Sequence, residues 1–383
     1  MARRSTKRGL SPSPELYVEL ANGSVVTWGD VTNGGNSSAV APLLTEGVVQ
    51  VCGTAQAFAA TKANGSVVTL GNANGGGDSS AAPLLREGVV QICGFFLTFA
   101  AIKANGSVVT WGDANCGGDS SAVAPLLTDG VVQVCGTFFA FAAIKANGSV
   151  VTWGDANGGG DSSAVAPLLK EGVVQVCGTR HAFAAIKANG SVVTWGDANG
   201  GGDSSAVAPL LTKSANGSVV TWGDVTNGGN SSAVAPLLTE GVVQVCGTAQ
   251  AFAAIKANGS VVTWGNVDGG GDSSAVAPLL REGVVQISGT FFAFAAIKAN
   301  GSVVTWGDAL SGGDSSAVAL HLREGVVQVR GIFRAFAAIK ANGSVVTWGR
   351  ALGGGDSSLL REGVIQALFL SGASQWWAMW IVF

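Results

Sequence analysis

Short apolar runs separated by turn residues follow one another along most of the chain. The most regular run is Ser-Val-Val-Thr-Trp-Gly, which first appears at Ser24–Gly29, directly after Asn22 and Gly23. β-Branched and aromatic residues favour strands, and Asn-Gly between two apolar runs is the strongest short-range hairpin signal, here of type I′. A second apolar run, Ala-Phe-Ala-Ala-Ile-Lys, precedes the turn in most copies. The pattern predicts one hairpin repeated along the chain.

The Asn-Gly turn recurs every 41 or 42 residues, except for one interval of 27 residues. Repeats of this length with short β segments are typical of propeller blades, and the Gly, Val and Thr content argues against a helical repeat. We therefore predict an all-β protein, a β-propeller of about 42-residue repeats in which seven blades are preferred and eight or nine are alternatives. The turn asparagines are Asn22, Asn64, Asn105, Asn147, Asn189, Asn216, Asn258, Asn300 and Asn342.

A full module begins with Gly-Val-Val-Gln-Val-Cys-Gly, continues through the hairpin, and ends with a Gly-rich loop, Asp-Ser-Ser and Ala-Val-Ala-Pro-Leu-Leu. The last segment is predicted to be a fourth, edge strand, because proline is tolerated at sheet edges. The aspartate and serine of the loop are expected to cap the turn through side-chain to backbone hydrogen bonds. The modules that contain all three main strands begin at Val48, Val89, Val131, Val173, Val242, Val284 and Val326.

Two places depart from the repeat. The module near residues 197–222 is stunted, because it lacks two of its strands, and residues Ala215–Ala254 repeat Ala21–Ala60 residue for residue. The chain also ends in an apolar stretch. We divide the chain into a basic disordered tail (1–15), a β-propeller (16–369) and an apolar tail (370–383) that is expected to close the first blade. A membrane anchor is the alternative for the apolar end, although Ala367–Phe383 is shorter than the ~20 residues that a spanning helix needs.

Composition narrows the classes of function. Apolar residues make up 47% of the chain and charged residues only 12%, which leaves little charge for the surface and favours self-association. Five of the six cysteines share one repeat position, and no Cys-x-x-Cys spacing is present, so no zinc site is predicted. We expect reduced, buried thiols and a cytoplasmic or nuclear protein that has no membrane role.

Catalysis has little basis in these residues. The two histidines, His181 and His321, occupy unrelated repeat positions and have no nucleophile partner in the pattern. The Gly-Gly-Gly-Asp loops recur once per module, whereas calcium-binding glycine-aspartate repeats recur every nine residues or so. We predict no enzymatic activity, no cofactor and no metal. The tryptophans of the repeated strand fall at one position, where Leu70 also occurs, and are predicted to pack between blades.

The run from Trp153–Gly160 to the next Asn-Gly-Ser-Val-Val-Thr-Trp-Gly resembles the repeat of the regulator of chromosome condensation family. That resemblance implies a seven-bladed propeller. The family's Gly-x-x-His is kept only at Gly178–His181, and its Gly-Gln-Leu-Gly loop is Gly-Gly-Asp-Ser here. The resemblance also implies three functions: a protein-interaction scaffold, a guanine-nucleotide exchange factor for a small GTPase at chromatin, and an adaptor related to propeller-bearing HECT ubiquitin ligases. We prefer the scaffold.

Positions that vary between modules are the candidates for partner contact. The residues after Cys-Gly differ from copy to copy, and they lie at strand ends, where propellers bind partners. Aromatic and basic residues are enriched at protein interfaces, although Phe side chains that fill gaps between loops are an equal alternative. The expected partner-binding residues are Phe138, Phe139, Arg180, His181, Phe291, Phe292, Phe333 and Arg334. The tail residues Arg3, Arg4, Lys7 and Arg8 are the candidates for a nucleic-acid or chromatin contact, and a solvated, disordered terminus is the favoured alternative for them.

Overall fold

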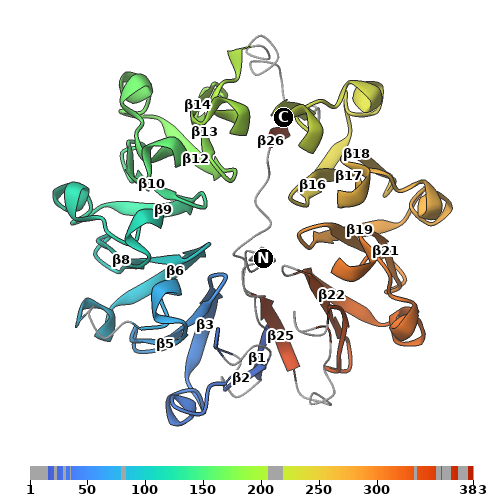
Figure 1. The fold of residues 1–383 in the computed structure, drawn as a ribbon, viewed down its shortest axis with the longest axis horizontal. Helices are drawn as coiled ribbons and strands as arrows, with labels where there is room; N and C mark the ends of the chain where they lie inside the picture. The colour runs from blue at the N-terminus through green and yellow to red at the C-terminus, as the bar shows by residue number, and fades with distance from the viewer. Residues whose placement is uncertain are drawn as a thin grey trace, which may run out of the picture.

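The computed structural model describes residues 16–20, 24–28, 32–34, 36–78, 83–205, 219–331, 334–350, 355, 364–369 and 378–382. Antiparallel sheets follow one another in chain order around a central axis, and the first strand of each full module lies toward that axis (Figure 1). The predicted all-β propeller is confirmed. Among the described residues, no helix has the length and apolarity needed to cross a bilayer.

Seven sheets are each built from one module, and they correspond to the seven complete modules of the sequence. Their strands are β3 (Val48–Gly53), β4 (Ala57–Lys62) and β5 (Val67–Gly71); β6 (Val89–Phe95), β7 (Thr98–Lys103) and β8 (Val108–Gly112); β9 (Val131–Gly136), β10 (Ala140–Lys145) and β11 (Val150–Gly154); β12 (Val173–Gly178), β13 (Ala182–Lys187) and β14 (Val192–Gly196); β16 (Val242–Gly247), β17 (Ala251–Lys256) and β18 (Val261–Gly265); β19 (Val284–Gly289), β20 (Ala293–Lys298) and β21 (Val303–Gly307); β22 (Val326–Gly331), β23 (Ala335–Lys340) and β24 (Val345–Gly349).

Two further sheets join distant parts of the chain. Strands β1 (Leu16–Leu20) and β2 (Val25–Trp28) are completed by β25 (Val364–Phe369). Strand β15 (Val219–Gly223), which belongs to the stunted module, pairs with β26 (Ala378–Val382). The described residues therefore form nine sheets, which is the largest of the predicted blade numbers of seven, eight or nine. Seven of these sheets are each made from a single module.

The pairing of the C-terminal strands corrects one prediction. The apolar segment 370–383 was expected to close the first blade, but β25 does so, and β26 pairs with β15 instead. The stunted module explains why β26 pairs with β15. It lacks the strand that would normally pair with β15, and the free N–H and C=O groups of an unpaired edge can bond to another strand. Strand β25 contacts β22 and β3, and β26 contacts β16, so both composite sheets lie between neighbours in the ring.

The Asn-Gly turn is not of type I′. That turn needs positive φ at both central residues. Here Gly65 has φ +76°, whereas no asparagine of the described residues has positive φ. The Gly65 N–H donates to the Lys62 carbonyl at 2.8 Å, so Ala63 and Asn64 occupy the centre of the turn and the glycine follows it. The Asn64 side chain then accepts a hydrogen bond from the Ser66 N–H at 3.0 Å.

The predicted fourth strand is also wrong. The Ala-Val-Ala-Pro-Leu segment forms a 3₁₀ helix, so each full sheet has three strands. Proline lacks the N–H that a strand ladder needs. The segment bonds to the third strand at the first residue of that strand, as when the Val150 N–H donates to the Leu169 carbonyl at 2.9 Å. The helices of this type are η1 (Ala41–Leu43), η3 (Pro83–Arg86), η5 (Ser121–Leu126), η7 (Ser163–Leu168), η11 (Ser232–Leu237), η13 (Ser274–Leu279) and η15 (Ser316–Leu322).

The Gly-rich loops form a second set of short helical turns at the opposite end of the third strand. Their aspartate or asparagine N-caps accept hydrogen bonds from backbone N–H groups, as Asp155 does from Gly158 at 3.0 Å. These turns are η2 (Ala73–Gly75), η4 (Ala114–Cys116), η6 (Ala156–Gly160), η8 (Ala198–Gly202), η10 (Val225–Asn227), η12 (Val267–Gly271) and η14 (Ala309–Ser311).

The core lies between neighbouring sheets. Residues Ala140 and Ala142 of β10 pack in one cluster with Phe183, Ala185 and Trp195 of the next sheet. The small alanines let the sheets approach, and the phenylalanine of the middle strand stacks on the tryptophan of the third, with Phe183 and Trp195 at 5.3 Å between ring centroids. The predicted place of the tryptophans between blades is confirmed.

Each described buried tryptophan also bonds to the preceding module. Its indole Nε1–H donates to a glycine carbonyl in the Gly-rich loop there, over 3.0–3.1 Å. Leu70 occupies the same position without this bond and is 7% exposed. The donors are Trp111, Trp153, Trp195, Trp222, Trp264, Trp306 and Trp348.

The close approach of the inner strands gives a testable prediction. A Cβ added at Gly289 would lie 2.3 Å from the Gly247 carbonyl oxygen of the neighbouring sheet. We expect Gly289→Ala to lower the free energy of unfolding by about 1–3 kcal/mol, because the inner strands must move apart. Val267→Ala, at a position 64% exposed, is the control and should change it by less than about 0.5 kcal/mol. Equal urea midpoints for the two variants would contradict this packing.

Candidate protein-binding face

The two ends of the ring carry different connections. At one end, which we call the loop face, the connection between the first two strands of a sheet lies against the Gly-rich loop. The Asp155 N–H, for example, donates to the Phe139 carbonyl at 2.8 Å. At the other end, which we call the hairpin face, lie the Asn-Gly turns. The expected partner-binding residues that the structure describes therefore belong to the loop face.

A buried threonine fixes this connection in five of the seven single-module sheets, at Thr54, Thr137, Thr179, Thr248 and Thr290. Thr137 is 1% exposed; its hydroxyl donates to the Gly158 carbonyl at 2.9 Å and accepts from the Phe139 and Ala140 N–H groups. Thr179 makes the same bonds in the next sheet. The two residues that follow the threonine are thus held on a rigid support, and these are the positions that vary between modules.

The first group of variable residues forms a stacked cluster across three sheets. Phe138, which is 4% exposed, stacks on Phe96 with 4.7 Å between centroids and 4° between planes. On its other side, the Arg180 guanidinium lies 5.0 Å from the Phe138 ring. Phe139 stacks on His181 at 5.2 Å. We call Phe96, Phe138, Phe139, Arg180 and His181 the aromatic cluster.

The second group lies on a different part of the ring. Phe291 and Phe292 meet edge to face at 4.6 Å, and the Arg334 guanidinium lies 5.5 Å from the Phe292 ring. The β15–β26 sheet and the β16–β18 sheet come between the two groups in ring order. The structure thus divides the expected residues into two patches. Phe333 and the tail residues Arg3, Arg4, Lys7 and Arg8 lie outside the described residues.

Phe96 is a member of the cluster that sequence reasoning missed. Its φ of +37° is the one positive value among the described residues other than glycine. The signal was present in the module: Phe95 replaces the usual threonine, and Thr98 replaces the usual alanine. Thr98 takes over the anchoring bond and donates to the Cys116 carbonyl at 3.2 Å. The connection is rearranged, and Phe96 is turned toward the next sheet.

The second patch borders a groove between neighbouring Gly-rich loops. This groove has a volume of about 810 Å³ and is lined by Phe292, Trp306, Asp268, Asp308 and Arg334, among others. Aspartates after the Gly-rich loops cap the next turn, as predicted, and Asp272 accepts from the Ser274 N–H at 2.8 Å. Hydrogen bonds from the Ser274 backbone and side chain lower the pKa of Asp272. Asp272 therefore carries a negative charge at neutral pH.

The six cysteines are free thiols that are buried or partly buried. Burial raises the pKa of Cys52 and of Cys246 to about 12. Burial and then the nearby carboxylates of Asp113 and Asp155 raise the pKa of Cys116 to about 12. A thiol with such a pKa is a poor nucleophile at neutral pH. Within the described ranges, no three His, Cys, Asp or Glu side chains are arranged to hold a metal ion.

The fold defines the molecule as a β-propeller whose variable residues lie on one face. No protein-family profile and no curated protein matches the chain. The ectodomain of the Physcomitrella patens receptor kinase CR4 is 13% identical, over 79% of this chain and 73% of that one, with a TM-score of 0.44. Prp20p from Saccharomyces cerevisiae is 13% identical over 78% of this chain and 82% of its own, with a TM-score of 0.42.

A chain from the complex of Kap60 with yeast RCC1 (Prp20) is 12% identical, over 99% of this chain and 94% of that one, with a TM-score of 0.43.

His181 provides a test of the aromatic cluster. Burial, and then the charge of Arg180, lower the pKa of His181 below its usual value. We expect Arg180→Ala to raise the pKa of His181, measured by NMR titration of the imidazole, because the opposing cation is removed. Arg180→Lys keeps the charge and is the control. A His181 pKa that is the same in all three proteins would contradict the geometry of the cluster.

The same shift fixes the direction of a pH effect on stability. The folded state binds a proton at His181 less readily than the unfolded state does. The neutral imidazole therefore favours folding above the unfolded-state pKa, and this contribution is lost as the pH falls through the folded-state pKa.

Proposed function

We propose that this protein is a non-enzymatic interaction scaffold that binds another protein through its loop face. The observation that carries the proposal is the aromatic cluster, in which Phe139, Arg180 and His181 are half-buried and held in fixed positions by threonine-anchored connections. Partly exposed aromatic and arginine side chains on a rigid support lose little conformational entropy when a partner covers them.

The repeat itself supports this choice of residues. Gln250 occupies in its module the position that Phe139, His181 and Phe292 occupy in theirs. The connection keeps its threonine bonds whichever side chain follows, because Thr248 donates to the Gly269 carbonyl at 2.8 Å. Folding therefore does not require an aromatic residue at this position. The aromatic side chains that some modules carry there are available for binding a partner.

The matched position defines the experiment. We expect Phe139→Ala combined with His181→Ala to reduce the recovery of specific partners in an affinity pull-down with mass spectrometry at least tenfold. Each half-buried aromatic anchor contributes about 1–2 kcal/mol or more to such contacts. Gln250→Ala is the control and should leave recovery unchanged. Partners that persist at full level in the double variant would contradict binding through the aromatic cluster.

Nucleotide exchange on a small GTPase is the second function that the sequence resemblance implies. Exchange needs no catalytic side chain, only a surface that distorts the nucleotide site of the GTPase. A nucleotide-release assay separates it from simple scaffolding: the scaffold hypothesis predicts unchanged release rates for candidate GTPases at saturating protein. Acceleration that is lost in the Phe139→Ala, His181→Ala variant would replace the scaffold with an exchange factor that acts through the same face.

A further inference from the structure

The hairpin face carries most of the exposed aliphatic surface of the described residues. Of the 17 large apolar side chains that are at least half exposed, 14 belong to this face. They occupy two repeat positions, the second valine of the inner strand and the first leucine of the Pro-Leu-Leu segment, with Leu320 beside that position in the last copy. They are Val49, Val90, Val132, Val174, Val243, Val285, Val327, Leu43, Leu84, Leu126, Leu168, Leu237, Leu279 and Leu320.

The valines are exposed because of a β-bulge. Val48 pairs with Lys62 and Gln50 pairs with Thr61, so Val49 is an extra residue with no partner in the ladder. Its side chain is 59% exposed, whereas Val48 is buried. The same bulge recurs in all seven single-module sheets. Bulges are structural features that redirect a side chain, and this one directs a valine out of the core in every module.

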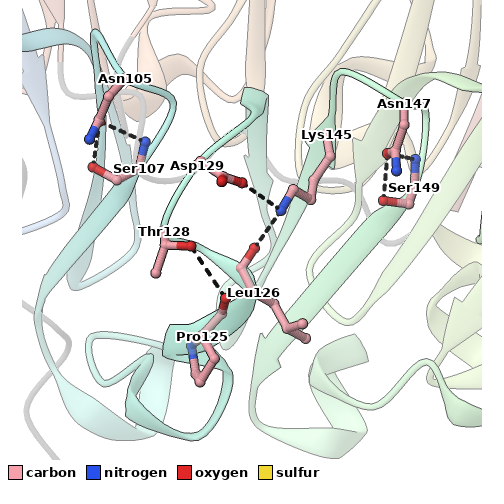
Figure 2. A network of polar contacts seen from close by, with 9 residues as sticks. All are labelled: Asn105, Ser107, Pro125, Leu126, Thr128, Asp129, Lys145, Asn147 and Ser149. Carbon is pink, nitrogen blue, oxygen red and sulfur yellow. Dashed lines mark hydrogen bonds and ion pairs between the residues drawn. The ribbon is translucent and has the colours of Figure 1, made fainter.

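The leucines lie at the same end of the sheets. The Lys145 ammonium at the hairpin end of β10 donates to the Leu126 carbonyl at 3.0 Å, and Figure 2 shows this bond beside the Asn147 turn. Leu127, the next residue, is 2% exposed and anchors the segment in the core, so Leu126 is directed outward. Near the inner strands, Val285 and Val327 of neighbouring sheets line one groove of about 540 Å³ together with Lys298 and Asn300.

We propose that two copies of this chain associate through their hairpin faces. The largest apolar patch on a typical monomer covers a few hundred Å², whereas one side of a stable protein interface takes ~20–30 residues. Fourteen exposed aliphatic residues, with the turn and lysine residues between them, supply a surface of that size. The ring presents the same two positions in every module, so a two-fold axis in the plane of the face brings like residues against like, as an isologous dimer requires.

The polar groups of this face are compatible with burial against a second copy. The Asn147 side chain accepts from the Ser149 N–H and hydroxyl, and the lysine ammonium is bonded to a leucine carbonyl, so few polar groups lose a partner (Figure 2). Lysines alternate with acidic residues around the ring, and the pair Lys145–Asp129 lies at 3.3 Å. Opposite charges interleaved in this way can pair across the interface. The acidic members are Glu46, Glu87, Asp129, Glu171, Glu240, Glu282 and Glu324.

These features favour a second copy over a lipid surface. The exposed set consists of valine and leucine, whereas tryptophan and tyrosine are the residues enriched at membrane interfaces. Because the dimer uses the face opposite the aromatic cluster, it leaves the proposed partner-binding residues accessible and does not depend on their function.

Sedimentation velocity of the full chain over a range of concentrations tests the proposal. We expect a species of two chains rather than one 38.1 kDa chain. Val132→Asp combined with Val285→Asp should weaken association more than about 100-fold, because each carboxylate would be desolvated in the interface. The matched control is Val267→Asp with Leu310→Asp, at positions 64% and 69% exposed on the loop face, which should leave the dimer intact.

A second pair of substitutions, Leu126→Asp with Leu279→Asp, guards against misfolding of the valine variant, and circular dichroism should show native β structure in each. Wild-type chain that is monomeric at all concentrations, or association that the loop-face control disrupts equally, would overturn the proposal. So would monomeric protein that sediments with vesicles of anionic phospholipid, because the hairpin face would then be a lipid-binding surface.

Discussion

Each single-module sheet of this protein has two apolar faces, which it covers by packing against its neighbours. The middle strand Ala182–Lys187 is flanked by sheets on both sides, and Ala182, Phe183, Ala184 and Ala185 are at most 1% exposed. An isolated three-stranded sheet with this composition would expose a phenylalanine, a tryptophan and several aliphatic residues. The stacking of sheets around a closed ring is therefore the interaction on which the other features depend.

This constraint divides the residues of a module into two kinds. Alanine, phenylalanine, tryptophan and the close-packed glycines recur in most copies, because each copy packs against the next in the same way, and the replacements Leu70 and Thr98 are buried as well. Positions outside the contact between sheets are free to change, and on the loop face they hold Phe138, Arg180 or Ala249 on the same threonine-anchored support. Any specificity of the protein therefore resides in a few positions on an invariant scaffold.

The sequence predicted the features that are determined within a single module. The strands, the hairpins, the tryptophans between blades and the aspartate caps follow from residues close together in the chain. The pairing of β26 with β15 did not, because a missing strand can be replaced by any free segment, and local sequence does not say which one. The 3₁₀ helix at Pro125 was missed because proline is compatible with both an edge strand and a tight helical turn.

For the candidate site, too, the sequence identified individual positions but not how the ring brings them together. The variable positions after Cys-Gly were found from the sequence, but their division into two patches depends on the order of sheets in the ring. The exposed Val49 was not anticipated, because Val-Val in a buried strand gives no sign of a bulge. Phe96 was missed because its placement depends on the exchange of an anchoring threonine between two positions of the module.

Hydrogen exchange of the tryptophan side chains, measured by NMR in D₂O, tests the packing of neighbouring sheets most directly. The indole N–H groups of Trp111, Trp153, Trp195, Trp222, Trp264, Trp306 and Trp348 each donate to a carbonyl of the preceding module. If neighbouring sheets pack as described, these protons exchange as slowly as the amides of the middle strands. Indole protons that exchange within the dead time, while strand amides stay protected, would show that the sheets form but do not meet.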